Sequence, residues 1–111
     1  MKEELLLLKI HNALNEGKGY YEATHGNWKV SNNRLDYIQY VVGFNRGKIV
    51  CVFQSTRWGI IEEGQDKGRK YFEGKEASVD LFSKLQSAEE KLLRKFGSGN
   101  PVAYAFISDI E

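Results

Sequence analysis

The sequence predicts an α+β domain with a mixed, largely antiparallel sheet of about four to five strands. An N-terminal helix and one or two C-terminal helices are expected to pack on this sheet. Two runs rich in Val, Ile, Tyr and Phe, residues 37–44 and 48–54, flank a short turn sequence, and segments of helical period lie towards both ends. With 111 residues, 41% of them apolar, the chain is long enough for a core, and one domain spanning residues 1–111 is expected.

Residues 3–16 are predicted to form the N-terminal helix. Their apolar residues recur at three- and four-residue spacings, acidic residues occupy the first turn, and Gly17 follows as a stop signal. The apolar positions are Leu6, Leu7, Ile10, Ala13 and Leu14. After this helix, three glycines interleaved with aromatic residues over 17–30 predict short extended pieces joined by tight turns.

The strongest local signal is a hairpin formed by residues 37–44 and 48–54, whose connection contains Asn45 and Gly47. In the first strand, alternation predicts Tyr40, Val42 and Phe44 on one face and Val41 on the other. In the second strand it predicts Ile49, Cys51 and Phe53 on one face and Val50 and Val52 on the other. Both faces are apolar, so these should be central strands covered on both sides, with helices as the expected cover.

The C-terminal half predicts a strand at 69–74, helical structure over 77–96 and a last strand at 100–107. The helical stretch should break into two short helices near Ser87, because Ser87 and Glu90 have the spacing of a capping box. Gly97 suits the end of the second helix.

The residues that could carry chemistry are few. His11, His25 and Cys51 stand at no metal-ligand spacing, and Cys51 lies mid-strand among apolar residues, which disfavours a reactive thiolate. The sequence shows no carboxylate pair and no phosphate-binding loop. We therefore expect no metal site, no cofactor, no catalytic residues and no enzymatic activity.

Charge and hydropathy favour a cytoplasmic, bacterial-type protein without a membrane partner. The formal net charge is +1, so any basic binding site must be local. The apolar run Leu5 to Leu8 is too short for a signal peptide or a membrane span, and the single Cys51 excludes an internal disulfide.

One local basic stretch lies between the two strands that end at 54 and begin near 70. A connection of this length in a compact domain is usually functional or disordered, and here cations interleave with aromatic residues, as single-stranded nucleic acid requires. The candidate nucleic-acid-binding residues are Arg57, Trp58, Lys67, Arg69, Lys70 and Trp28. The structural alternative stays open: Trp58 could cap the sheet, Phe72 could be core, and the lysines could be a solvated edge.

The stretch from Tyr20 to Tyr104 resembles a small bacterial domain that follows the nuclease in proteins carrying a GIY-YIG nuclease of the LEM-domain type. The matching positions are Glu22, Ala23, Thr24, Trp28, Arg34, Gly47, Val52, Phe53, Trp58, Arg69, Phe72, Gly74, Asn100, Pro101 and Tyr104. Two positions depart from the pattern: His25 replaces an arginine, and the aromatic Tyr71 is displaced by one residue.

The resemblance implies that the protein acts together with proteins that handle DNA. It implies no cleavage activity, because nothing here resembles the nuclease half. Two classes of function stay open. The first is a nucleic-acid-binding accessory module, with DNA or RNA as partner, in a DNA-handling or defence system. The second is a protein-interaction or structural subunit that docks a protein partner or forms a homodimer. Among the shared residues, Trp28 and Asn100 are expected to be structural, Asn100 by tying the last strand to a loop.

Overall fold

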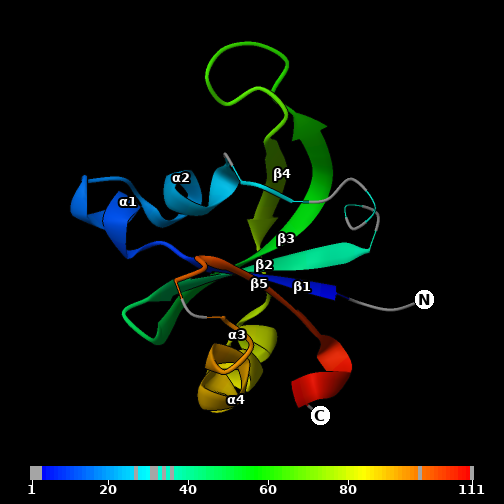
Figure 1. Ribbon diagram of the computed structural model, residues 1–111. Helices are drawn as coiled ribbons and strands as arrows, with labels where there is room; N and C mark the ends of the chain where they lie inside the picture. Colours follow the sequence, from blue (N-terminus) through cyan, green and yellow to red (C-terminus); the bar gives the residue numbers. More distant parts are fainter. Residues whose placement is uncertain are drawn as a thin grey trace.

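The computed structural model describes residues 4–26, 28–30, 33, 35, 37–97 and 99–110 of the chain. One five-stranded sheet in the order β4-β3-β2-β1-β5 forms its centre, and helices pack on it (Figure 1). The strands are β1 (Glu4–Lys9), β2 (Ile38–Asn45), β3 (Lys48–Ile60), β4 (Lys70–Glu76) and β5 (Val102–Phe106). The helices are α1 (His11–Asn15), α2 (Tyr20–His25), α3 (Val79–Ser87), α4 (Glu89–Leu93) and the 3₁₀ helix η2 (Ile107–Ile110). The predicted α+β class is confirmed, with only the β1–β2 pair parallel.

The N-terminal segment corrects the prediction of a helix over 3–16. Residues Glu4–Lys9 form β1, which pairs in parallel with β2 and antiparallel with β5, and only His11–Asn15 are helical. Leu5, Leu6, Leu7 and Leu8 all have 0% exposure. A run of four consecutive apolar residues fits a strand buried on both faces, because successive side chains point to opposite sides. The helical spacing within 3–16 was therefore coincidental in its first half.

The segment after α1 also differs from the prediction of extended pieces. Tyr20–His25 form α2, where the hydroxyl of Thr24 donates back to the carbonyl of Tyr20 at 2.9 Å and Thr24 is fully buried. Gly26 is extended, and Trp28 forms an isolated antiparallel bridge with Lys70. The glycines on either side of α2 mark its limits, and the residues between them are helical.

The central hairpin of β2 and β3 is confirmed. Its two-residue turn places Arg46 at φ 53° and Gly47 at φ 85°, the positive values that a type I′ turn needs. Val42 and Phe44 face one core and Val41 the other, as predicted. The predictions that Ile49 shares a face with Cys51 and that Val50 lies on the opposite face from Cys51 are both wrong.

An irregularity in the register explains the position of Ile49. Gly43 pairs with Cys51, but the next residue, Phe44, pairs with Ile49, so Val50 is an extra residue on β3. This β-bulge shifts the alternation by one position. Ile49 therefore packs with Val52, whereas Cys51 lies in the opposite core.

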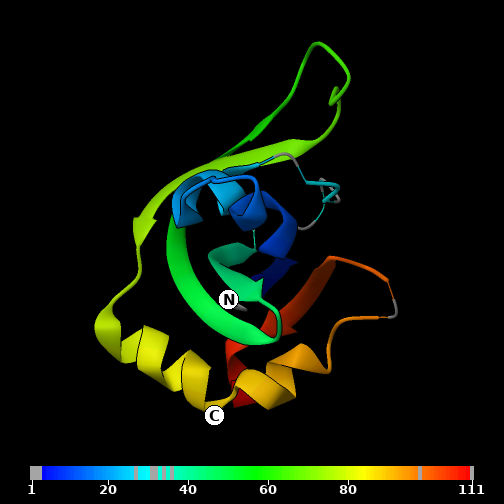
Figure 2. The ribbon, with the colours of Figure 1, turned by 90° about the vertical axis from the view of Figure 1, so that its left-hand side faces the viewer.

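Two hydrophobic cores lie on the two faces of the sheet. One contains Leu5 and Leu7 with Leu85 of α3 and Leu92 of α4, and the other contains Leu6 and Leu8 with side chains of α1 and α2. Figure 2 shows α1 and α2 on one side of the curved sheet and α3 and α4 on the other. The predicted helical cover on both faces is confirmed.

The C-terminal helices break where predicted, but by a different mechanism. The hydroxyl of Ser87 donates to the carbonyl of Ser83 at 3.0 Å within α3, and α4 starts after Ala88 without a side-chain cap. Ser78 caps α3 instead, accepting from the Leu81 N–H at 3.2 Å. The predicted capping box at Ser87 is therefore wrong, and α4 ends at Leu93, ahead of Gly97.

The last strand is closed at both ends by side chains. Asn100 Oδ1 accepts from the Val102 N–H at 3.0 Å, and Asp109 Oδ2 accepts from the Phe106 N–H at 2.8 Å. Asn100 thus ties the last strand to its own entry, as expected, but it is exposed, so its loss costs less than that of a buried hydrogen bond. Asp109 also lies 3.5 Å from Lys95 Nζ.

The hydrogen bond that Asp109 accepts at the end of β5 can be tested through its dependence on pH. Its hydrogen bond from Phe106, assisted by the charge of Lys95, lowers the pKa of the Asp109 carboxyl. Its contribution to stability is therefore present at neutral pH and is lost as the pH falls through the lowered pKa. We expect Asp109→Ala to reduce the unfolding free energy by about 1 kcal/mol, or about 4 °C in Tm, at pH 7.

Thermal unfolding monitored by circular dichroism at several pH values measures this effect. The difference from wild type should shrink below the ordinary range of aspartate pKa values. Ser108→Ala, an exposed change in the same 3₁₀ helix, is the matched control and should leave Tm unchanged. A deficit that is the same in acid and at neutral pH would contradict a role for the ionised carboxylate.

Cys51 gives a second test, of the packed sheet. The residue is 7% exposed, and burial raises the pKa of its thiol to about 12. We expect a thiol reagent at neutral pH to label the native protein far more slowly than the protein in denaturant, since the thiolate is the reactive form. Native labelling as fast as denatured labelling would contradict the burial.

Candidate functional site

The β3–β4 hairpin projects beyond the body of the molecule (Figure 1). β3 continues to Ile60 and β4 begins at Lys70, so the predicted long loop over 54–70 is wrong: the connection comprises residues 61–69. Arg57 and Trp58 are strand residues, and Trp58 pairs with Phe72 across the hairpin. The candidate residues are therefore held largely by sheet structure.

The loop is closed at its base by backbone hydrogen bonds. Ile61 donates to the carbonyl of Arg69 at 2.8 Å, and Gly68 donates to the carbonyl of Ile61 at 2.8 Å. Gly68 has φ 89°, a left-handed conformation that favours glycine. This closure fixes Arg69 at the root of the loop.

The segment after α2 is fixed to the hairpin by the Trp28–Lys70 bridge. The two backbone hydrogen bonds between these residues measure 2.9 and 2.8 Å, and the indole Nε1 of Trp28 donates to the carbonyl of Thr24 at 2.9 Å. Lys70 is 7% exposed, and its Nζ donates to the carbonyl of Gly68 at 2.6 Å. Lys70 and Trp28 therefore support the hairpin from inside, which agrees with the structural role expected for Trp28.

The bridge brings a third cation beside the loop. Lys29 follows Trp28 and shares with Lys67 and Arg69 an open cavity of about 630 Å³, which also involves Val30, Gln65 and Gly68. We call this the basic cavity. Lys29 is not among the predicted residues, because it lies far from the loop in sequence and no local pattern predicts the bridge that brings it there.

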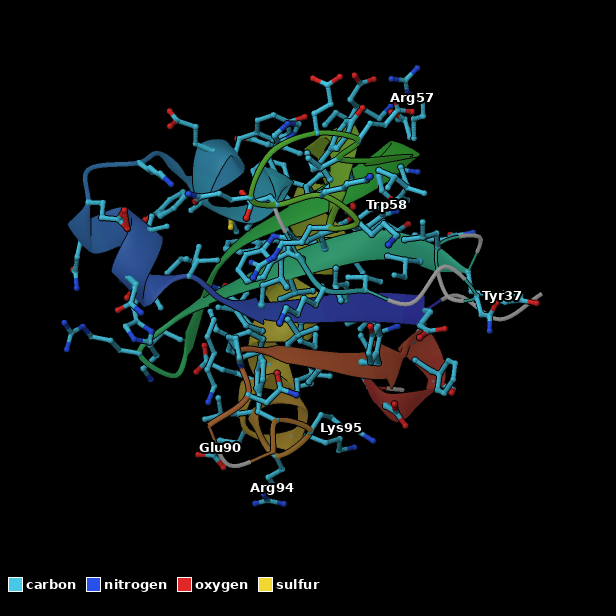
Figure 3. All side chains as sticks on the ribbon, turned by 45° about the horizontal axis from the view of Figure 1, so that its top comes forward. Tyr37, Arg57, Trp58, Glu90, Arg94 and Lys95 are labelled. Carbon is cyan, nitrogen blue, oxygen red and sulfur yellow. The ribbon has the colours of Figure 1, made fainter. Side chains whose placement is uncertain are left out.

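A second cavity, of about 400 Å³, lies beside β3 and contains Arg57 and Trp58 together with Ser55 and Thr56. Leu35 and Ile38 complete its lining. We call it the Trp58 cavity. It lies where β2 begins at Ile38 while β3 runs on, since the β2–β3 ladder extends along β3 only to Gln54. Figure 3 shows Arg57 at the periphery and Trp58 nearer the sheet.

The indole of Trp58 has one unusual feature. Its ring packs on Phe72 with centroids 5.4 Å apart, and its Nε1 is buried without a hydrogen-bond partner in the described part of the chain. A buried unpaired donor is rare in folded proteins, so it is a candidate contact for a ligand acceptor. Phe72 itself is 0% exposed, which confirms it as core.

The charges around the hairpin are mixed. Arg57 Nε lies 3.4 Å from Glu73 Oε2 across the strands, and Arg69 Nε lies 3.7 Å from Asp66 Oδ1. The side chains of these pairs are substantially exposed, so a phosphate can compete for either arginine. Glu62 also stands exposed in the loop. The positive surface is therefore small and local.

The six predicted residues thus separate into three groups. Lys67 and Arg69 meet in the basic cavity, Arg57 and Trp58 meet in the Trp58 cavity, and Trp28 and Lys70 lie behind them as supports. Arg34, a position of the resemblance, lies outside the described residues.

Within the described ranges, no three His, Cys, Asp or Glu side chains gather as a metal site, and no helix is long and apolar enough to cross a membrane. No family model, curated protein or solved structure matches the chain. The site must therefore be interpreted from its own geometry.

The support given by Trp28 is testable. Trp28→Phe keeps an aromatic ring but removes the donor to the buried Thr24 segment, so we expect the unfolding free energy to fall by about 1 kcal/mol. Urea denaturation followed by circular dichroism measures this. Tyr37→Phe, a change at an exposed ring, is the control. Equal stability of Trp28→Phe and wild type would show that the Trp28–Thr24 hydrogen bond is not a structural tie.

Proposed function

We propose that this protein is a non-catalytic nucleic-acid-binding module that contacts a single strand along the β3–β4 hairpin. The observation that carries the proposal is the grouping of Lys29, Lys67 and Arg69 in one cavity, with Arg57 and Trp58 in a second cavity on the same hairpin. Cations supply phosphate contacts, and the partly exposed Trp58 supplies contact to a base.

The basic cavity suits a phosphate. Three cations come from two segments that the Trp28–Lys70 bridge holds together, so the charges are placed before the ligand arrives. Arg69 offers a planar guanidinium, and Lys29 and Lys67 are exposed point charges. About three phosphate contacts imply weak binding that depends on salt.

The Trp58 cavity suits an unstacked base. Trp58 presents an apolar wall beside the hydroxyl-bearing Ser55 and Thr56, and its unpaired Nε1–H can donate to a base acceptor. Arg57 lies in the same lining and is exposed enough to reach a flanking phosphate. A paired base in a duplex is less able to enter such a cavity, so single strands should bind better.

The resemblance to the domain that accompanies LEM-type GIY-YIG nucleases supports the same proposal, because those nucleases are bacterial proteins that handle DNA. Trp58 and Arg69, one from each cavity, belong to the positions that carry the resemblance. On this proposal the protein is a cytoplasmic accessory module of a DNA-handling or defence system.

Fluorescence anisotropy with labelled single-stranded DNA, single-stranded RNA and duplex DNA at low salt tests the proposal. We expect affinity in the micromolar range or weaker, with a slope of log K against log salt of about −2 to −3. Arg69→Glu should weaken binding to every sequence alike. Trp58→Leu should weaken the binding of single strands more than the binding of duplex DNA.

Lys91→Glu is the matched control, because it makes the same change in net charge at an exposed position of α4. It should leave binding nearly unchanged, provided that circular dichroism shows each variant folded. Absence of binding at tens of micromolar protein, or binding that ignores salt, would overturn the proposal and favour a protein-interaction subunit.

A further inference from the structure

A third cavity, of about 260 Å³, lies on the opposite edge of β3 from the Trp58 cavity and is independent of the proposed nucleic-acid surface. β4 pairs with β3 from Phe53 outward, so the inner part of β3 lacks β4 as a neighbour. The cavity occupies this position, between Tyr20 of α2 and Val79 and Phe82 of α3. Figure 2 shows β3 curving between these two helices.

Three backbone groups of β3 near the cavity already have partners, which argues against a simple strand addition here. Ala77 donates to the carbonyl of Val52 at 3.0 Å, and Glu89 Oε1 accepts from the Ile49 N–H at 2.7 Å. Gln86 Nε2 donates to the carbonyl of Ile49 at 3.4 Å. What the cavity offers a ligand is therefore its side chains.

The lining combines an apolar body with one charge. Val50 and Val79 supply aliphatic surface, Tyr20 and Phe82 supply aromatic rings, and Glu76 is the one charged residue in the lining. Tyr20 is 50% exposed and Val79 77% exposed, both unusually high for large apolar residues. A ligand between them would remove both from water.

The carboxylate of Glu76 is available to a ligand. No Lys or Arg in the described part of the chain forms an ion pair with it. Glu76 lines the cavity together with Cys51, and its charge contributes to the raised pKa of the Cys51 thiol, after the larger effect of burial. An unpaired carboxylate in a lining that also contains aromatic rings is a combination that recognises an organic ammonium ion.

We propose that this cavity binds a small free amine in which an ammonium group is attached to a short apolar body, such as an arylalkylamine. Glu76 pairs with the ammonium, Tyr20 and Phe82 contact it through their rings, and the valines hold the apolar body. The volume lies slightly below the roughly 300–1,000 Å³ of pockets for drug-sized ligands, so the ligand is of fragment size.

Two-dimensional ¹H–¹⁵N NMR titration with 2-phenylethylammonium tests this inference. We expect saturable shifts at millimolar concentration, centred on residues 50–53 and 76–82. The neutral isostere 2-phenylethanol should bind about tenfold more weakly, and 3-phenylpropionate should bind more weakly still, because its carboxylate would face Glu76.

Glu76→Gln removes the charge with little change in shape. It should weaken the binding of 2-phenylethylammonium about tenfold and leave the affinity for 2-phenylethanol unchanged. Glu73→Gln is the matched control, an exposed carboxylate on the same strand outside the cavity, and should leave the affinity for the ammonium unchanged. Tyr20→Leu should also weaken the ammonium more than the alcohol.

Equal affinities of the ammonium, the alcohol and the carboxylate would overturn the inference, as would shifts centred elsewhere on the protein. Absence of shifts up to tens of millimolar would overturn it as well. A lysine-containing peptide that binds while the free amine does not would assign the cavity to a protein partner instead.

Discussion

The structure depends on the burial of one strand on both faces. The four leucines of β1 are excluded from water and contribute alternately to the two cores. Displacing either layer of helices would therefore expose leucine side chains to water. Burying a leucine side chain is worth roughly 2 kcal/mol, which makes this strand a large part of the difference between folded and unfolded chain. The interior position of β1, between β2 and the edge strand β5, follows from this constraint.

The same constraint explains where the candidate sites lie. With the middle of the sheet covered on both faces, ligand surface is left where strands of unequal length fail to overlap. β3, at 13 residues, outruns β2 at one end and β4 at the other, and the Trp58 cavity and the cavity beside Glu76 lie at these two mismatches. The third surface, the basic cavity, lies at the loop end of the β3–β4 hairpin, where the Trp28–Lys70 bridge fixes a segment distant in sequence to β4.

Local sequence patterns predicted the parts of the fold that depend on neighbours in the chain. The β2–β3 hairpin and the last strand follow from turn residues and alternation. The break between α3 and α4 lies where it was predicted, although the capping box that predicted it does not form. The identity of β1 was missed, because a short apolar run has no period that separates a strand from a helix, and only pairing with distant strands decides. The bulge at Val50 was missed for a similar reason: its signature is in the partner strand.

The candidate site was likewise predicted only in part, namely for residues that lie close together in the sequence. Arg57, Trp58, Lys67 and Arg69 stand in one sequence stretch and do line cavities, whereas Lys70, in the same stretch, points inward. Composition shows how many cations a stretch has, but strand alternation decides which of them reach solvent, and the alternation depends on where the strand begins. Lys29 became visible only with the long-range bridge at Trp28.

The position of β1 has a consequence for how the protein is made. Leu5 pairs with Tyr40 on one side and with Ala105 on the other, so the first strand of the sheet acquires its second neighbour only from the last one. During synthesis β1 emerges well before β5, so one edge of β1 stays unpaired until β5 has been translated. Non-local pairing of this kind slows folding and prolongs the time in which an apolar edge is open to aggregation. The nascent chain is therefore most exposed to misassociation, and to capture by chaperones, while β5 is still missing.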